Sequence, residues 1–257
     1  MGEPAVLVDG LSEAYRRRSS RGWRRPRGAE RWALEDVSVS VEPGASLGVI
    51  GPNGSGKTTL LRCIAGLIAP TRGSMRTTGR VVSLIDPSAG FHRELTGREN
   101  ALVDGVLCGM SRMEVHARLD AIAAYAGLNG ETFDAPLMTY TAGLVVRLGF
   151  SVIVHSDPRV LVIDEVLGTA DEAFKRRALD RLDELTRGGA AVVLASHDLD
   201  LVLRTCDQVA VLAEGRLLSL GPTHETLEAY RHRMGDASAA RAGRPKGGSE
   251  RSRRPGP

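Results

Sequence analysis

Short apolar runs alternate with amphipathic stretches along the chain, and this pattern predicts an α/β fold. The segments S-L-G-V-I (46–50), V-L-V-I-D (160–164) and A-A-V-V-L-A-S (190–196) suit buried parallel strands. Between the last two, residues 172–187 have the periodicity of a helix. Strands that alternate with helices are typical of a mostly parallel sheet covered by helices.

Further strands are predicted near both ends of the chain. The run at 6–8 is short and apolar, and residues 33–41 alternate between apolar and polar positions, as an antiparallel strand does. A turn at Pro70–Gly73 is expected before another strand at 79–85. Towards the C-terminus, a hairpin around Glu214–Gly215 precedes a last helix. These segments predict an antiparallel β subdomain beside the parallel sheet.

Residues 95–126 are helical in pattern, with a break near Gly109 and Ser111. Because they lie between two predicted strands of the main sheet, we expect an inserted helical lobe at about residues 90–157. The folded domain is expected to span residues 1–235. Residues 236–257 contain almost nothing apolar besides alanine and are expected to be disordered.

The positive charge is concentrated in two segments. Residues 16–31 hold eight Arg and one Glu, and residues 236–257 hold five Arg and one Lys against one Asp and one Glu. The net charge of the whole chain is +3, so the remaining residues carry −8. An acidic core argues against a nucleic-acid partner. For the Arg-rich loop 16–31 we expect a solvated, mobile loop, the alternative being contact with anionic lipid headgroups or an acidic partner.

The apolar runs are far shorter than the ~20 residues that cross a bilayer, and no charged-then-apolar leader begins at Met1. The sequence therefore predicts a protein that stays in the cytosol. The three cysteines have no metal-ligand spacing and are expected to be reduced, mostly buried thiols. They are Cys63, Cys108 and Cys206.

Residues 51–58 read G-P-N-G-S-G-K-T, a complete G-x-x-x-x-G-K-[ST] phosphate-binding loop between a predicted strand and a predicted helix. Backbone N–H groups of such a loop surround the β-phosphate, Lys57 bridges the β- and γ-phosphates, and the Thr58 hydroxyl binds Mg²⁺. The alternative is a glycine-rich turn. The candidate nucleotide-binding residues are Gly51, Pro52, Asn53, Gly54, Ser55, Gly56, Lys57, Thr58 and Thr59.

Two carboxylates follow the strand at 160–164, at the sheet edge where ligands bind in open α/β folds. Asp164 is the candidate Mg²⁺ ligand, together with Thr58, and Glu165 is the candidate base that orients the attacking water. His197 follows the next strand and is the second candidate catalytic residue, able to reach the γ-phosphate. The alternatives are a solvated strand end and a surface histidine.

The segment Y-T-A-G-L (140–144) completes a set of five ordered motifs, through which residues 5–233 resemble the nucleotide-binding subunits of ABC transporters. The resemblance implies ATP and Mg²⁺ as ligands, and a homodimer that encloses two ATP molecules. It also implies a separate transmembrane permease and a place on the cytoplasmic face of the membrane. Residues implied to contact nucleotide or the second subunit are Thr141 and Gly143 of the signature loop, Asp171, and Tyr15 stacked on adenine, with Trp32 as the competing aromatic.

Departures from the common signature, Ala142 and Leu144, look like the branch that exports lipid-linked surface polysaccharides, as do residues 90–100 and 164–174. Such ATPases commonly have a glutamine after the strand at 79–85, but the only glutamine of this chain is Gln208. Its role is vacant or is taken by another polar group, the candidates being Asp86, Ser88 and Glu94. Residues 86–94 lie where a permease would dock, with Phe91 as an apolar anchor or an ordinary loop aromatic.

The sequence thus predicts an ATPase subunit that powers an exporter, with lipid-linked polysaccharide as the expected substrate. One alternative is an exporter ATPase for drugs or lipids. Another is a weakly hydrolysing nucleotide-dependent switch, suggested by the altered signature and the missing glutamine. A soluble ABC ATPase of DNA repair or translation is less compatible, because the chain has no coiled-coil insertion and no second ATPase copy.

Overall fold

The computed structural model describes residues 2–15, 31–86, 90–165 and 171–242. Its strands are β1 (Val6–Tyr15), β2 (Arg31–Val41), β3 (Ser46–Ile50), β4 (Arg72–Thr77), β5 (Val81–Leu84), β6 (Val160–Asp164), β7 (Ala191–Ala195), β8 (Gln208–Ala213) and β9 (Arg216–Pro222). Its helices are α1 (Lys57–Ile64), α2 (Gly97–Leu107), α3 (Arg112–Ala126), α4 (Gly130–Phe133), α5 (Ala142–Val154), α6 (Glu172–Arg187), α7 (Leu199–Thr205) and α8 (Thr223–Ala242), with a 3₁₀ turn at Leu137–Thr139.

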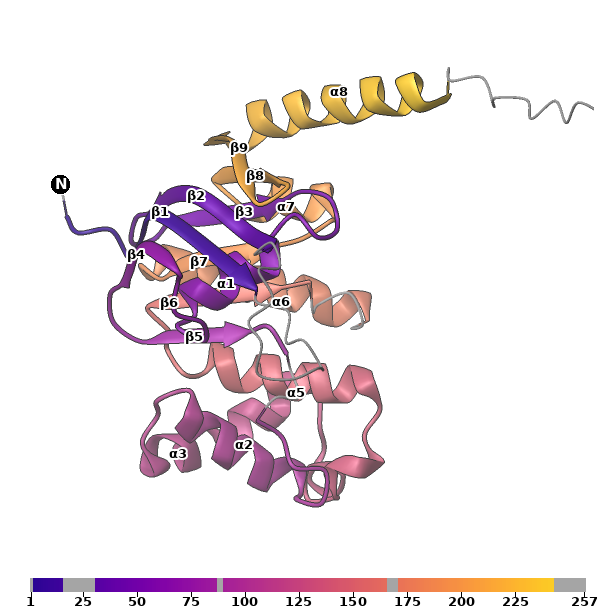
Figure 1. Ribbon diagram of the computed structural model, residues 1–257. Helices are drawn as coiled ribbons and strands as arrows, with labels where there is room; N and C mark the ends of the chain where they lie inside the picture. The colour runs from indigo at the N-terminus through magenta and orange to yellow at the C-terminus, as the bar shows by residue number, and fades with distance from the viewer. Residues whose placement is uncertain (1, 16–30, 87–89, 166–170, 243–257) are drawn as a thin grey trace, which may run out of the picture.

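The main sheet has the strand order β5-β6-β7-β3-β8-β9, in which β5 to β8 are parallel and β9 runs antiparallel to β8 (Figure 1). Alternate residues of each central strand enter different apolar cores. On β6, Val160 and Val162 face the core around α1, whereas Leu161 and Ile163 face the core around α5, α6 and α7. Because both faces are covered, β6 is apolar throughout and not alternating. The predicted parallel α/β sheet is confirmed.

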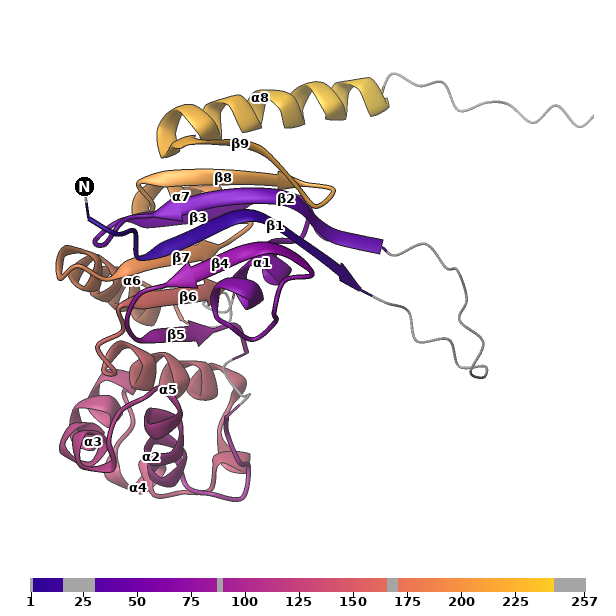
Figure 2. The same cartoon turned by 60° about the vertical axis from the view of Figure 1, so that its left-hand side comes forward.

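A second, antiparallel sheet of order β2-β1-β4 lies on the other side of α1 (Figure 2). The predicted turn at Pro70–Gly73 is wrong in its second half, because β4 begins at Arg72. The sequence R-G-S-M-R-T has no strand pattern of its own and becomes a strand by pairing with β1. A Cβ on Gly73 would lie 2.3 Å from the Gly10 carbonyl oxygen, so only glycine permits this pairing.

The helical lobe formed by α2 to α5 extends below the main sheet (Figure 2). Its two first helices begin with full capping boxes, Thr96 with Glu99 on α2 and Ser111 with Glu114 on α3. The break predicted near Gly109 is the connection between them. Tyr125, Phe150 and Phe174 pack edge to face or stacked between α3, α5 and α6, which joins the lobe to the main sheet's helices.

The last helix, α8, continues through residues 236–242, so the disordered tail predicted from residue 236 is wrong for this part. The sequence D-A-S-A-A-R-A is rich in alanine, the best helix former, and extends a helix that is already nucleated. Residues 243–257 of that tail and the Arg-rich loop at 16–30 lie outside the described residues. Within the described ranges, no helix is long and apolar enough to span a membrane.

Candidate active site

A cavity of about 1660 Å³ lies beyond the carboxyl ends of β3 and β6. Open α/β sheets bind ligands at this edge. The cavity brings together segments that are far apart in the sequence. Of the predicted site residues, those that line it are Tyr15, Pro52, Asn53, Gly54, Ser55, Gly56, Lys57, Thr58, Thr59, Asp164 and Glu165.

The loop between β3 and α1 has a backbone that only glycine can adopt at two positions. Gly51 has φ 148° and a Cβ there would lie 2.0 Å from the Leu212 carbonyl oxygen. Gly56 has φ 105° and its Cβ would lie 2.5 Å from the Ala33 carbonyl oxygen. Gly56 also forms the N-cap of α1, which has no side-chain cap, so the first N–H groups of α1 are available to an anion.

Lys57 is buried, and its ammonium lies under the loop. The Nζ atom donates to the carbonyl oxygens of Gly51 at 2.9 Å and Pro52 at 3.4 Å, and it lies 4.0 Å from Glu165 Oε1. Beside it, the Ser55 hydroxyl is buried without a hydrogen-bond partner among the described residues. A buried hydroxyl needs a partner, and the Lys57 ammonium beside it is a cation that an anion would bind more strongly than carbonyls do. The loop therefore fits a bound phosphate group.

Thr58 and Asp164 form the second half of the site. The Thr58 hydroxyl donates to Asp164 Oδ2 at 2.7 Å, which places a hydroxyl and a carboxylate oxygen side by side. Hard oxygen donors of this kind suit Mg²⁺, which binds through one or two protein ligands together with substrate phosphates and water. In the described ranges, no three His, Cys, Asp or Glu side chains are grouped to hold a metal.

Glu165 has a strained backbone. Its φ is 24°, uncommon for a residue other than glycine, and its N–H donates to the Ala195 carbonyl oxygen at 3.1 Å. The carboxylate lies between Lys57 and the imidazole of His197, whose Nδ1 is 3.4 Å from Glu165 Oε2. His197 does not line the cavity, and its side chain is 77% exposed. The structure thus brings Glu165 and His197 together at the mouth of the site.

The signature residues lie at the N-terminal end of α5. Thr141 is the N-cap and accepts the Leu144 N–H at 3.3 Å through its hydroxyl. Ala142 and Val146 reach the edge of the cavity, but Thr141 and Gly143 do not line it.

Asp171 also lies away from the cavity. It is the N-cap of α6, where it accepts the Phe174 N–H at 2.8 Å and pairs with Arg147 at 3.3 Å. The Phe174 N–H, and after it the Arg147 guanidinium, lowers the pKa of the Asp171 carboxyl. Within one chain, Asp171 therefore caps α6 and links it to α5, and it contacts no part of the cavity.

Two aromatic side chains line the outer end of the cavity. Tyr15 is 46% exposed, and its hydroxyl is 3.3 Å from the Thr59 hydroxyl. Trp32 also lines the cavity, but the Arg72 guanidinium lies 4.9 Å from its ring centroid and covers one face. Tyr15 keeps its ring open to a ligand more fully than Trp32 does.

The structure adds cavity residues that the motifs did not indicate. Glu214 and Gly215, at the turn of the β8–β9 hairpin, line the cavity, and the Gly215 N–H donates to the Ser55 carbonyl oxygen at 3.1 Å. The hairpin was predicted, but its approach to the loop depends on strand pairing. The glutamine expected after the strand at 79–85 is absent, and Ile85, just after β5, lines the cavity. Asp86 and Glu94 do not line it, and Ser88 lies outside the described residues.

The family model described as ABC transporter matches residues 34–168. The O-antigen export system ATP-binding protein RfbB of Myxococcus xanthus is 37% identical over 254 residues, 93% of this chain and 58% of that protein. RfbB of Klebsiella pneumoniae is 39% identical over 208 residues, 81% of this chain and 84% of that protein. The first of these relatives is thus much longer than this chain.

Among solved structures, the fold is similar to that of the dimeric ATP-binding cassette MJ0796 in a post-hydrolysis state bound to ADP and Pi. The TM-score is 0.73 at 18% identity, and the match covers 85% of this chain and 98% of that one. At this identity the likeness concerns the fold alone.

Proposed function

The chain belongs to the ABC transporter family, and from this premise we propose that it is the ATP-binding and ATP-hydrolysing subunit of an exporter. The observation that carries the proposal is the cavity in which the phosphate loop, the Thr58–Asp164 pair and Glu165 meet. The unpartnered Ser55 hydroxyl and the buried Lys57 ammonium support a phosphate ligand there.

In this proposal the loop residues 51–59 hold the phosphates of ATP, and Tyr15 stacks on adenine. Lys57 exchanges its carbonyl partners for phosphate oxygens, to which an ammonium binds more strongly. Thr58 and Asp164 hold Mg²⁺. When bound, Mg²⁺ neutralises charge on the β- and γ-phosphate oxygens.

Glu165 acts as the base. Its carboxylate accepts a proton from the attacking water, and the strained backbone fixes its direction. His197 contacts the same carboxylate from the open side of the site and couples the γ-phosphate to movement of the loop after β7. Both groups lie at the cavity mouth, where a second copy would exclude water.

We further propose a homodimer in which Thr141 and Gly143 of one copy cap the ATP of the other. The Thr141 hydroxyl accepts the Leu144 N–H, which leaves its own proton free to donate to a phosphate oxygen. Asp171, at the start of α6, then lies near the dimer contact. The structurally similar MJ0796 cassette is itself dimeric, which supports the proposal of a dimer but not its contacts.

The proposed cargo is a lipid-linked cell-surface polysaccharide, since both relatives named above are O-antigen export proteins. A separate transmembrane permease would carry it, with this subunit on the cytoplasmic face of the membrane. Phe91 is partly buried against the lobe's own apolar core, so only part of its ring is open to a partner. The proposed permease contact is instead the exposed apolar face of α2, formed by Val103, Val106 and Leu107.

A second candidate function is a nucleotide-dependent switch with weak hydrolysis. The observation in its favour is the absence of a glutamine from the cavity lining, because Gln208, the chain's only glutamine, lies on β8 and does not line it. A switch of this kind binds ATP and dimerises but turns over slowly.

Steady-state ATP hydrolysis by the purified chain tests the proposal, with Glu165→Gln beside the wild type and size-exclusion chromatography in ATP and Mg²⁺. Loss of the base should lower the rate by about 10²–10⁴-fold and trap an ATP-bound dimer. Glu228→Gln, an exposed carboxylate on α8, serves as the matched control and should keep the wild-type rate.

Equal rates for Glu165→Gln and Glu228→Gln would refute the role of Glu165. A dimer in ATP with very slow hydrolysis by the wild type would favour the switch. If no variant, and not the wild type either, binds ATP or dimerises, both functions are contradicted.

A further inference from the structure

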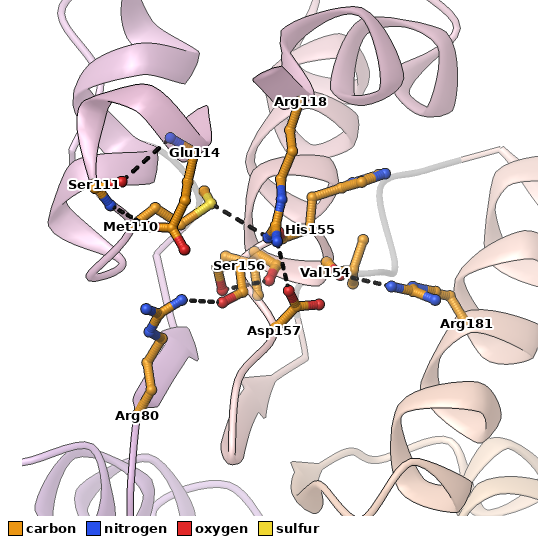
Figure 3. A network of polar contacts seen from close by, with 11 residues as sticks. Arg80, Met110, Ser111, Glu114, Arg118, Val154, His155, Ser156, Asp157 and Arg181 are labelled. Atoms are coloured by element: carbon orange, nitrogen blue, oxygen red, sulfur yellow. Dashed lines mark hydrogen bonds and ion pairs between the residues drawn. The ribbon is translucent and has the colours of Figure 1, made fainter. Parts of the chain in front are cut away.

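Three arginine side chains from three elements meet at the C-terminal end of α5 (Figure 3). Arg80 precedes β5, Arg118 lies on α3 and Arg181 lies on α6. Each guanidinium donates a hydrogen bond to a different backbone carbonyl of three successive residues. In the same order, the acceptors are Ser156, His155 and Val154. We call these three side chains the arginine clamp.

The end of α5 needs such donors. The last carbonyl groups of a helix have no partner within it, and they carry the negative end of the helix dipole. The last turn of α5 has no basic residue of its own, and Ser156 is fully buried. Val154 is the last residue of α5, His155 is its C-cap and Ser156 follows it, so the three guanidinium groups bind carbonyls at and just beyond the helix end. They place positive charge where the dipole favours it.

The clamp also ties this end to the rest of the molecule. Arg118 forms an ion pair with Asp157 at 2.7 Å, just after α5. The carbonyl oxygen of Arg80 accepts the N–H groups of Arg159 and Val160 at 2.8 and 3.0 Å, which fixes Arg80 to the start of β6. The C-terminal end of α5 is therefore held at once by the lobe, the main sheet and α6.

The other end of α5 is more exposed, although Arg147, in its second turn, pairs with Asp171. Residues 148–154 are all buried, whereas Thr141 and Ala142, at the N-terminal end, are exposed. A helix of 13 residues is ~20 Å long, so a tilt of about 5° at one end moves the other by about 2 Å. Errors of about 1 Å in a reacting assembly can cost about 10²-fold in rate. The orientation of Thr141 and Gly143 thus depends on the fixed end.

We infer that Arg80, Arg118 and Arg181 are positioning residues: they fix the C-terminal end of α5 so that Thr141 and Gly143 meet the nucleotide of a second copy. The inference rests on the proposed function, because it assumes that α5 presents these two residues across a dimer. It assigns the clamp no contact with nucleotide. The clamp should therefore affect turnover and dimer formation but not the binding of ATP to one chain.

The test compares two clamp variants of the full-length chain with matched arginine controls. Arg118→Gln is paired with Arg98→Gln, which removes a lobe arginine bound to Asp134. Arg181→Gln is paired with Arg187→Gln, which removes an α6 arginine bound to Asp183. Both controls lose an ion pair without touching α5. Arg118→Lys keeps a charge and a donor and should restore part of the effect.

Each variant is measured for kcat and KM of ATP hydrolysis, for binding of a fluorescent ATP analogue, and for dimer formation in a Glu165→Gln background. Clamp variants should lower kcat and the dimer fraction by about 10-fold while analogue affinity changes less than about 2-fold. Backbone hydrogen exchange at residues 141–147, measured without nucleotide, should be about 5-fold faster than in the controls, with exchange in α1 unchanged.

Clamp variants that match their controls in kcat, dimer fraction and exchange would overturn the inference. So would a parallel loss of analogue affinity and melting temperature, which would indicate a purely structural role. If the wild type itself neither hydrolyses ATP nor dimerises, the proposed function fails. In that case exchange at residues 141–147 still decides whether the clamp orients the start of α5.

Discussion

Two helix N-termini of this chain face a phosphate in the proposed mechanism, and they are built in opposite ways. The start of α1 has a glycine N-cap with φ 105°, no side-chain cap, and buried residues from its first turn onward. The start of α5 has a regular threonine N-cap with φ −71° and an exposed first residue. The first helix start has no side-chain cap and leaves its N–H groups for an anion, whereas the second is capped by a threonine side chain.

This difference indicates which of the two helix starts can bind phosphate within one chain. Unsatisfied N–H groups are costly unless a ligand uses them, so the loop before α1 is prepared for phosphate within one chain. At the start of α5, by contrast, the Thr141 side chain caps the Leu144 N–H. The contribution of this helix start to a nucleotide site depends on being carried to the right place, which makes it the partner-dependent half of the mechanism.

Matched glycine substitutions at the two helix starts should separate them most strongly. In Gly56→Ala, the new methyl group would lie 2.5 Å from the Ala33 carbonyl oxygen in a left-handed conformation. Strain of about 1–3 kcal/mol and the displaced loop should weaken ATP binding by about 10²-fold. Gly143→Ala should leave affinity within about 2-fold but lower the ATP-dependent dimer fraction about 10-fold.

Binding of a fluorescent ATP analogue and size-exclusion chromatography measure the two effects. Gly143 lies in the first turn of α5, where alanine is the better helix former by about 0.5–1 kcal/mol. A lost dimer in this variant is therefore not a folding defect. Equal loss of ATP affinity in Gly56→Ala and Gly143→Ala would contradict the predicted difference between the two helix starts.

The helical lobe contains a carboxyl that destabilises it at neutral pH, Asp104 on α2. Burial raises the pKa of this carboxyl to about 6. The unfolded chain releases the proton near pH 4, so the native state is penalised as pH rises from about 4 to 6. The penalty is complete above pH 6 and absent below the unfolded pKa. Asp104→Asn should therefore stabilise the protein by about 1–2 kcal/mol at pH 7.5 and by nothing near pH 3.5.

Urea denaturation at pH 7.5 and pH 3.5 checks this sign. Asp120→Asn, an exposed aspartate on α3 of the same lobe, is the control and should change stability by less than about 0.5 kcal/mol at either pH. The pKa argument would be wrong if Asp104→Asn stabilised the protein equally at both pH values. If Asp104→Asn raises the free energy of unfolding at pH 7.5 but not at pH 3.5, the Asp104 carboxylate destabilises the lobe at neutral pH.

The prediction from sequence succeeded where a few consecutive residues carry the geometry. The loop at 51–58 is contiguous, and Asp164 and Glu165 follow a strand with a clear apolar pattern, so the sequence placed both segments at the sheet edge where they now line one cavity. The family resemblance rested on the order of such local motifs and is confirmed. The helix break near Gly109 was equally local.

Features that depend on tertiary contacts could not be predicted from the sequence. Strand β4 is polar and exists through its pairing with β1. Glu214 reaches the cavity because the β8–β9 turn bonds to the Ser55 carbonyl oxygen. The arginines of the clamp are separated by dozens of residues, and nothing in their neighbours' patterns distinguishes them from surface arginines. A single sequence contains no signal for such meetings.

The smallest expected effect concerns the threonine caps of the two lobe helices. Thr96 belongs to a full capping box, with hydrogen bonds to and from Glu99 of 2.9 to 3.1 Å, whereas Thr141 makes one cap bond of 3.3 Å. Thr96→Ala should cost about 1 kcal/mol in urea denaturation and Thr141→Ala about half of that. Only Thr141→Ala should lower the ATP-dependent dimer fraction, and Thr141→Ser should restore it. If Thr96→Ala reduced dimerisation as much, the loss would follow lobe stability, and the hydroxyl of Thr141 would have no role beyond its own helix.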